Sequence, residues 1–142
     1  MTDATRRMIW LLSHAHRRVL ARSDAGLIDL GLTSTQAGAL FCFRGEEGLL
    51  VGELAAALDL AQSAASGLAA RMVEAGLVAR SDDPNDRRAA RLTLTPTGRR
   101  ARTEAARRAN SANTEMMQEF TDAEMATVVR WLTHVAKLED GR

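Results

Sequence analysis

The chain has 142 residues and a formal net charge of +1, which is enough length for one domain or for two small lobes sharing a core. Apolar residues make up 46% of it but aromatic residues only 4%, and this balance favours closely packed helices over an aromatic-rich sheet sandwich. Apolar runs such as GLLVGELAAALDL carry acids and are too short to span a membrane, and the N-terminal residues lack a signal-peptide pattern. A single cysteine excludes an intramolecular disulfide, so we expect a cytoplasmic protein.

The small net charge conceals an uneven distribution along the chain. Residues 71–108 hold ten arginines and five acids, a local balance of +5, whereas residues 109–142 come to −3 and residues 1–70 to −1. A basic block inside a nearly neutral chain favours a polyanionic partner at one face. For any single arginine, a solvated helix surface is the alternative.

The first part of the chain is expected to be helical. Residues 2–23 repeat apolar side chains and His16 on one face, and AGLIDLGL then breaks the pattern with two glycines. Thr33 and Gln36 form a capping-box pattern at the start of the next helix, and Leu32 and Ala37 stand where a hydrophobic staple would form. The expected buried face of this helix consists of Ala37, Leu40, Phe41 and Phe43.

Two short helices are expected next. The first spans about 52–58, and the second spans 61–76, with Gly76 at its end in the left-handed conformation. Its inward positions are Ala65, Leu68 and Met72, and its outward positions are Gln62, Ser63, Ser66, Gly67 and Ala70. Two short helices joined by three or four residues make a helix-turn-helix.

The periodicity then changes from helical to two. GLVAR and ARLTLT are strand-like, and the DPND between them is strong turn chemistry, which predicts a β-hairpin. Thr95 followed by Pro96 begins a helix that runs to about Gln118. A second capping-box pattern, Thr121 with Glu124, opens the last helix.

A helix-turn-helix followed at once by a two-stranded hairpin is a winged helix. We therefore predict a mainly α (α+β) fold with a DNA-binding lobe at 31–95 and dimerisation helices at 1–30 and 96–142. The second helix of the lobe would enter a DNA major groove, and the hairpin would reach a neighbouring minor groove. The helices outside the lobe, at 1–30 and 96–142, carry more apolar surface than one small lobe can cover. We therefore predict a homodimer that binds palindromic double-stranded DNA.

Four segments follow one another between residues 31 and 99, namely GLTSTQAGAL, VGELAAALDL, AASGLAARMVEAGLVAR and DPNDRRAARLTLTPTGR. This series resembles the MarR (multiple antibiotic resistance regulator) family of winged-helix transcription factors. The last segment is the most specific, because the family's wing carries an Asp-x-Arg core, matched here by Asp86, Arg87 and Arg88, before a strand that ends in Leu-Thr. The exit from that strand is matched by Leu94, Thr95, Pro96 and Gly98.

The resemblance implies a dimeric regulator, a repressor of a pseudo-palindromic operator that a small phenolic or aromatic effector releases. It also implies that Arg88, steadied by Asp86, enters the minor groove, where the negative potential of a narrow groove attracts arginine. The recognition helix departs from the family pattern: Gly67 stands where a larger polar residue is common, and Leu50 where a capping threonine is. Its candidates for base edges or phosphates are Gln62, Ser63 and Ser66. We therefore expect the wing and the shape of the DNA to contribute more to binding than major-groove contacts.

Several arginines have two interpretations. Arg71 either contacts phosphate or pairs with an acid of the wing. Arg80 and Arg91 either contact phosphate or are solvated strand residues. The run Arg99, Arg100 and Arg102 either binds an anionic partner or is simply exposed to solvent.

The expected effector pocket is lined by Trp10, His14, His16 and Phe41, with packing in the core or the dimer as the alternative for the aromatic residues. We expect Cys42 to act as a small hydrophobic residue with a raised pKa and to be no oxidant sensor. Two histidines only two residues apart on a helix, with His134 remote, predict no metal site and no cofactor.

No nucleophile–base set or pair of acids points to an enzyme. The alternative function is a winged helix that serves as a protein–protein module, although a basic wing argues against it.

Overall fold

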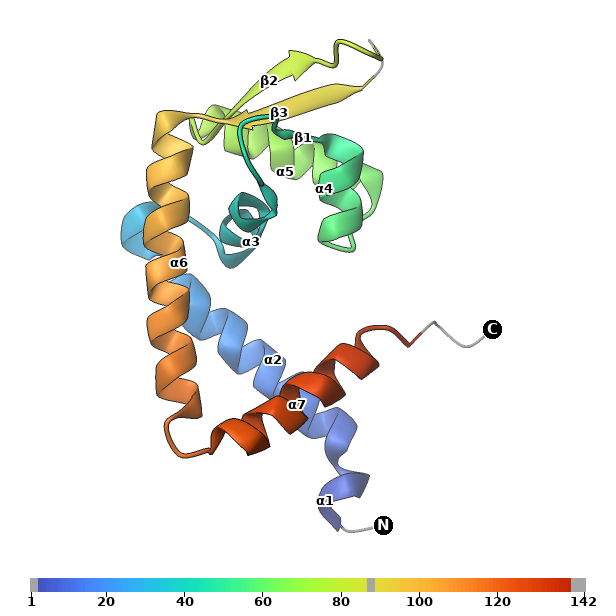
Figure 1. The fold of residues 1–142 in the computed structure, drawn as a ribbon, viewed down its shortest axis with the longest axis vertical. Coiled ribbons are helices and arrows are strands. Elements are labelled where there is room, and N and C mark those ends of the chain that lie inside the picture. Colours follow the sequence, from blue (N-terminus) through green and yellow to red (C-terminus); the bar gives the residue numbers. More distant parts are fainter. Residues whose placement is uncertain (1–2, 87–88, 139–142) are drawn as a thin grey trace. The chain divides into compact units, whose positions relative to one another are not determined.

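The computed structural model describes residues 3–86 and 89–138. Its elements, in chain order, are α1 (Asp3–Arg6), α2 (Met8–Ala25), the 3-10 helix η1 (Ile28–Leu30), α3 (Ser34–Cys42), β1 (Leu49–Leu50), α4 (Val51–Ala57), α5 (Gln62–Glu74), β2 (Val78–Asp82), β3 (Ala90–Leu94), α6 (Pro96–Met117) and α7 (Asp122–Val135) (Figure 1). The chain forms two compact units, residues 1–107 and 108–142. The predicted winged helix-turn-helix, α4 and α5 followed by β2 and β3, is confirmed and lies in the first unit.

The predicted helix starts are built as the sequence indicates. The Thr33 hydroxyl accepts a hydrogen bond from the Gln36 amide at 3.1 Å, and the Gln36 side chain accepts one from the Thr33 amide at 2.9 Å. Thr121 and Glu124 make the same reciprocal pair. Each box satisfies backbone N–H groups that have no partner within their own helix. The Thr95 hydroxyl accepts from the Gly98 amide at 3.0 Å, so Thr95 caps α6.

Three details differ from the prediction. The first helix is interrupted at Arg7 and extends to Ala25, and a two-residue strand, β1, precedes α4. A strand this short has no period that a sequence pattern could reveal. Phe41 was predicted on the buried face of its helix and is wrong: its side chain is 43% exposed, whereas Ala39 and Phe43 are buried.

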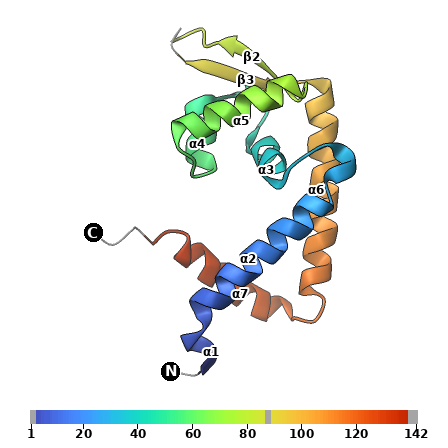
Figure 2. The same cartoon turned by 180° about the vertical axis from the view of Figure 1, so that it is seen from behind.

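The sheet has three antiparallel strands in the order β1-β3-β2, so β3 is central. Leu92 of β3 pairs with Leu49 on one side and with Arg80 on the other. Figures 1 and 2 show α5 against the hairpin of β2 and β3, with α3 on the side of α5 away from the strands, and α4 lies beside α5 directly after β1. This arrangement leaves the outward face of α5 and the end of the hairpin available to a partner.

The hydrophobic core joins the helices of the lobe to its sheet. Its most fully buried side chains are Leu40, Leu54, Leu68, Met72, Leu92 and Val78. The predicted inward stripe of α5, Ala65, Leu68 and Met72, is confirmed. At Gly98, a Cβ would overlap the backbone carbonyl of Leu77, so glycine is what allows α6 to start so close to the strand.

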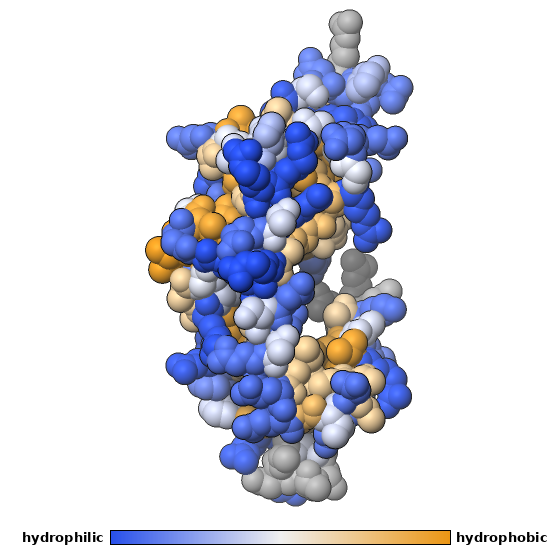
Figure 3. Space-filling view, turned by 60° about the vertical axis from the view of Figure 1, so that its left-hand side comes forward, coloured by the Kyte–Doolittle hydropathy of each residue, from blue (hydrophilic) through white to orange (hydrophobic). Residues whose placement is uncertain are grey.

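The outer helices keep much apolar surface in contact with solvent. Among the described residues of α2 and α7, no side chain is buried. Large exposed side chains on these two helices include Ile9, Trp10, Leu11, Val19, Leu20, Val128, Val129, Trp131 and Leu132. Figure 3 shows hydrophobic side chains open to solvent among the charged ones. Within the ranges 3–86 and 89–138, no helix is long and apolar enough to cross a membrane.

Candidate DNA interface

The outward face of α5 is small and polar. Gln62 and Ser63 are exposed in its first turn, and Ser66 and Gly67 follow one turn later, half-buried. The Ala61 residue before the helix provides no side-chain cap. Amide groups of the first turn therefore lack a side-chain acceptor, and small neighbours leave the backbone accessible to an anionic partner.

A cleft of about 540 Å³ lies between α4, α5 and the hairpin. Its lining includes four residues that the sequence singled out, namely Gln62, Ser66, Arg80 and Asp86. The remaining walls come from the start of α4 and from Ala89 and Ala90. The fold thus brings predicted residues from one helix, one strand and one turn to a single surface.

Arg71 lies over Gly67 on the outward face of α5. A Cβ at Gly67 would lie 3.4 Å from the Arg71 guanidinium, which is ordinary van der Waals contact, so the two residues are neighbours on this face. Among the described residues, Arg71 forms no ion pair, and the wing acid Asp83 pairs with Arg91 instead. The ion pair between Arg71 and a wing acid is therefore not formed among the described residues, and a contact of Arg71 with phosphate stays a prediction.

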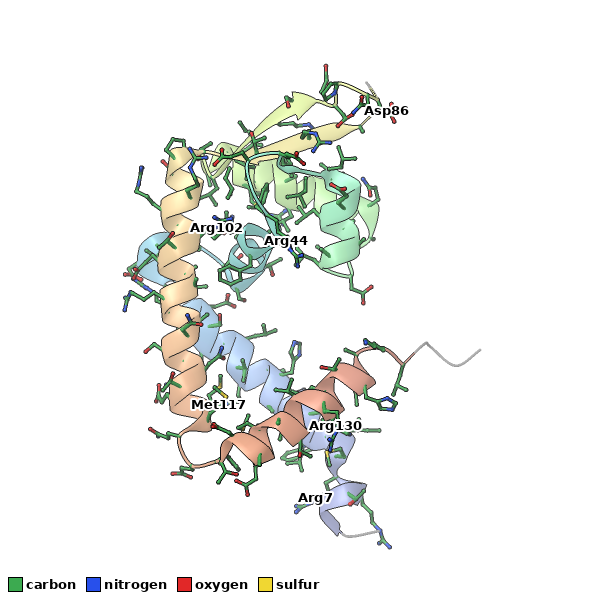
Figure 4. All side chains as sticks on the ribbon, in the orientation of Figure 1. Arg7, Arg44, Asp86, Arg102, Met117 and Arg130 are labelled. Carbon is green, nitrogen blue, oxygen red and sulfur yellow. The ribbon has the colours of Figure 1, made fainter. Side chains whose placement is uncertain are left out.

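The wing is β2, β3 and the residues between them. Figure 4 places Asp86 at the far end of this hairpin. The Asp86 carbonyl accepts a hydrogen bond from the Ala89 amide at 2.9 Å, and the Ala89 carbonyl accepts one from the Asp83 amide at 3.0 Å. Arg87 and Arg88, which the resemblance assigns to DNA, lie outside the described residues.

Arg91 occupies a different environment from the predicted phosphate contact. Its Nε and Nη2 donate to Asp83 Oδ2 at 2.9 and 2.7 Å, and its Nη1 donates to the Glu47 carbonyl at 3.0 Å. The Arg91 hydrogen bonds, more than any other cause, hold the pKa of the Asp83 carboxyl below its ordinary value. Sequence reasoning recognised Asp83 only as a turn residue and missed this pair, because a partner eight residues away across a hairpin leaves no local pattern.

The start of α4 shows how the chain compensates for Leu50. Leu50 has no hydroxyl to cap the helix, but its own amide donates to the Glu53 carboxylate at 2.6 Å. This is half of a capping box, and the Glu three residues after the N-cap position was the signal that could have found it.

Comparison with known proteins identifies the fold and its family. Residues 30–89 match a model of the MarR family. A MarR-family transcriptional regulator from Rhodococcus sp. RHA1 is 27% identical, with a TM-score of 0.83 over 96% of this chain and 97% of that one. Residues 30–89, the winged helix-turn-helix part of the chain, are therefore of the MarR type. Members of this family are transcriptional regulators and are not enzymes.

Two further proteins are similar to this chain. BpsR from Bordetella bronchiseptica is 25% identical, with a TM-score of 0.85 over 98% of this chain and 99% of that one, and its structure concerns regulation of DNA binding by 6-hydroxynicotinic acid. YsmB from Bacillus subtilis (strain 168), an uncharacterised HTH-type transcriptional regulator, is 37% identical over 78 residues. That match covers 55% of this chain and 53% of YsmB, about half of each.

The residues expected at a MarR-type effector pocket are partly brought together. The Trp10 and His14 rings stack with their centroids 5.1 Å apart and their planes 6° apart, and Trp10 is 57% exposed. His16 is exposed on the same helix, α2, whereas Phe41 is exposed on α3. Of the four residues predicted to line the pocket, the structure shows a ring contact between Trp10 and His14.

The Cys42 thiol is half-buried on α3. It donates to the Gly38 carbonyl at 3.4 Å, and burial raises the pKa of the Cys42 thiol while the charge of Arg44 lowers it slightly. The raised pKa agrees with the sequence prediction, and it reduces the fraction of reactive thiolate.

Proposed function

We propose that this MarR-family regulator is a dimeric repressor that binds a pseudo-palindromic operator in double-stranded DNA. The observation that carries the proposal is the surface on which Gln62 and Ser66 of α5 meet Arg80 of β2 along one cleft. A helix with small polar outward residues fits a major groove, and a neighbouring arginine supplies charge for the phosphates. Ser63 and Arg71 extend the same surface along α5.

The wing supplies the second part of the interface. Arg80 and the tip residues Arg87 and Arg88 belong to the basic block of residues 71–108. We assign Arg88 to the minor groove on the resemblance of the Asp86–Arg88 segment to the family's wing. An arginine there gains from the enhanced negative potential of a narrow groove.

The dimer would be formed by the outer helices, with residues 31–95 as the DNA-binding lobe. The support is that α2 and α7 each expose large apolar side chains, since a monomer rarely keeps so much apolar surface in water. A symmetric dimer would present two α5 helices to two half-sites, which is why we expect an inverted repeat.

A small aromatic acid would release the DNA. BpsR, whose DNA binding responds to 6-hydroxynicotinic acid, supports this class of effector. The stacked Trp10 and His14 rings offer a flat aromatic surface to such a molecule. The effector acts only if it binds the DNA-free conformation more tightly than the DNA-bound one.

The proposal is tested by the affinity of the purified protein for duplex DNA as salt is raised. Neutralisation of phosphates releases counterions, so the logarithm of the affinity should fall steeply and linearly with the logarithm of the salt concentration. Gln62→Ala should weaken the binding of a selected site more than that of random duplex. Affinity for duplex that is absent or independent of salt would instead favour a protein–protein module.

A further inference from the structure

Asp83 is the one buried charged residue among those that the structure describes, with 5% of its surface exposed. Both of its carboxylate oxygens are occupied. Oδ2 accepts from Nε and Nη2 of Arg91, and Oδ1 accepts from the amides of Asn85 at 2.8 Å and Asp86 at 3.1 Å. One carboxylate therefore fixes both the fold of the turn and its attachment to the returning strand.

Arg91 extends this attachment to a third segment. Its Nη1 donates to the carbonyl of Glu47, 44 residues earlier, in the loop that leads into β1 and α4. The neighbouring Gly48 has a φ of +72°, and a Cβ there would overlap the Leu92 carbonyl. The guanidinium thus ties the wing to the loop that positions the first helix of the helix-turn-helix.

These contacts leave Arg91 poorly suited to bind phosphate. Three of its nitrogen atoms already donate to protein oxygens, and its side chain is 27% exposed. Turning the guanidinium toward DNA would leave the buried Asp83 carboxylate without a positively charged partner, which is strongly unfavourable. The Asp83–Arg91 pair therefore fits a role in holding the wing in place better than a role in contacting phosphate.

We propose that Asp83 and Arg91 are positioning residues for DNA binding, whose ion pair holds the wing in the orientation that places its tip against DNA. The proposal rests on the function proposed above. It reassigns Arg91 from phosphate contact to support, and it gives Asp83 a positive role in binding a polyanion although its own charge repels one.

The direction in which Asp83→Asn changes the affinity for DNA distinguishes a positioning role of Asp83 from simple charge repulsion. By electrostatics alone, Asp83→Asn removes a negative charge near DNA and should strengthen binding. If the pair positions the wing, Asp83→Asn instead weakens the binding of duplex DNA about fivefold or more at matched salt, because the Asn side chain loses the charge that holds Arg91. Asp82→Asn is the matched control, since it removes the same charge from the adjacent, exposed residue of β2 and should leave affinity unchanged or higher. Equal or tighter binding by Asp83→Asn than by Asp82→Asn overturns the proposal.

Arg91→Lys is the second variant. Lysine keeps the charge that a phosphate contact requires, but it cannot reproduce a planar fork shared between a carboxylate and a carbonyl. We expect Arg91→Lys to lose about as much affinity as Asp83→Asn, and the double variant to lose little more than either one, as expected for two residues acting as a unit. Wild-type affinity for Arg91→Lys would restore the phosphate-contact assignment and contradict the proposal.

A measurement without DNA distinguishes failure of this inference from failure of the proposed function. Amide hydrogen exchange in the free protein should be faster at Asn85 and Asp86 in Asp83→Ala than in wild type, whereas amides within α5 should keep their protection. Unchanged exchange at both turn amides overturns the pair's role in holding the wing. Protected turn amides in a wild-type protein that binds no duplex would instead refute the proposed function and, with it, the positioning role in DNA binding.

Discussion

The Asp24 carboxylate near the end of α2 accepts two hydrogen bonds from Ser34, the first residue of α3. The Ser34 amide donates at 2.6 Å and the Ser34 hydroxyl at 2.7 Å, both to Oδ1. These bonds hold the pKa of the Asp24 carboxyl below its ordinary value, with the hydroxyl bond as the largest cause. A residue of the predicted dimerisation region thus supplies a cap to a helix of the predicted DNA-binding lobe.

The Asp24–Ser34 contact predicts a pH-dependent contribution to stability. Because the pKa of Asp24 is lowered in the folded protein, its contribution is present above the ordinary aspartate value of about 3.9 and is lost as pH falls through the lowered value. Asp24→Ala should therefore have a lower urea midpoint than wild type at pH 7, and the difference should shrink as the pH is lowered toward 3. Ser34→Ala, which removes only the hydroxyl bond, should show a smaller effect. A difference that grows on acidification would show that the carboxylate is not held in this way.

Gly98 should be among the least replaceable residues at the junction of the hairpin and α6. A methyl group there would overlap the Leu77 carbonyl, and backbone cannot move aside as a flexible side chain can. We expect Gly98→Ala to destabilise the protein by about 1–3 kcal/mol, measured by denaturant unfolding. Gly38→Ala is the control, because its Cβ would lie 3.7 Å from Leu58 in ordinary contact, and it should be neutral or stabilising by about 0.5–1 kcal/mol. Equal effects of the two substitutions would mean that the close approach at Gly98 does not exist in solution.

Arg88→Ala tests the assignment of the wing tip. If Arg88 enters the minor groove, its loss should weaken operator binding by about 1–3 kcal/mol, which corresponds to roughly 5- to 150-fold. Arg17→Ala removes an equal charge from an exposed position on α2 and should change affinity little. Fluorescence anisotropy at matched salt measures both variants. If Arg88→Ala binds as tightly as wild type, the assignment of Arg88 to the minor groove is wrong. The positive charge at the interface would then come from other arginines, Arg80 and Arg71 first.

The exposed apolar side chains of α7 predict that one charged substitution there disrupts the proposed dimer. Leu132 is 42% exposed, and Leu132→Asp would place a carboxylate within an apolar interface, where it has no partner. We expect light scattering at micromolar concentration to find a dimer for wild type and a monomer for Leu132→Asp. Thr127→Asp, an exposed polar position on the same helix, should remain dimeric. A monomeric wild-type protein would remove the basis for two half-sites.

Cys42 should not confer sensitivity to peroxide. Burial raises the pKa of its thiol, and thiolate is the form that peroxide attacks. DNA affinity measured before and after mild peroxide treatment should be the same for wild type and for Cys42→Ser. Loss of binding in wild type alone would establish an oxidant response through this residue.

The sequence predicted those elements that local chemistry determines. Thr33, Thr121 and Thr95 each start a helix through hydrogen bonds to residues three positions away, a distance over which a pattern is visible. The inward stripe of α5 followed from its period in the same way.

The contacts that were missed join residues distant in the chain. Arg91 meets Asp83 across the hairpin and Glu47 in an earlier loop, and Asp24 meets Ser34 across a turn. Phe41 was misplaced because an apolar residue on a short helix can face either the core or solvent, and only the packing of the neighbouring helices decides between them. The DNA-binding roles of the candidate residues remain predictions.

We propose that this chain acts as a dimer on an inverted repeat, and selection from a pool of random duplexes tests that proposal most directly. The enriched sequences should share two half-sites in inverted orientation, and a titration at high concentration should saturate at two protomers per duplex. No enrichment, or enrichment of a single half-site occupied by one protomer, would contradict the account.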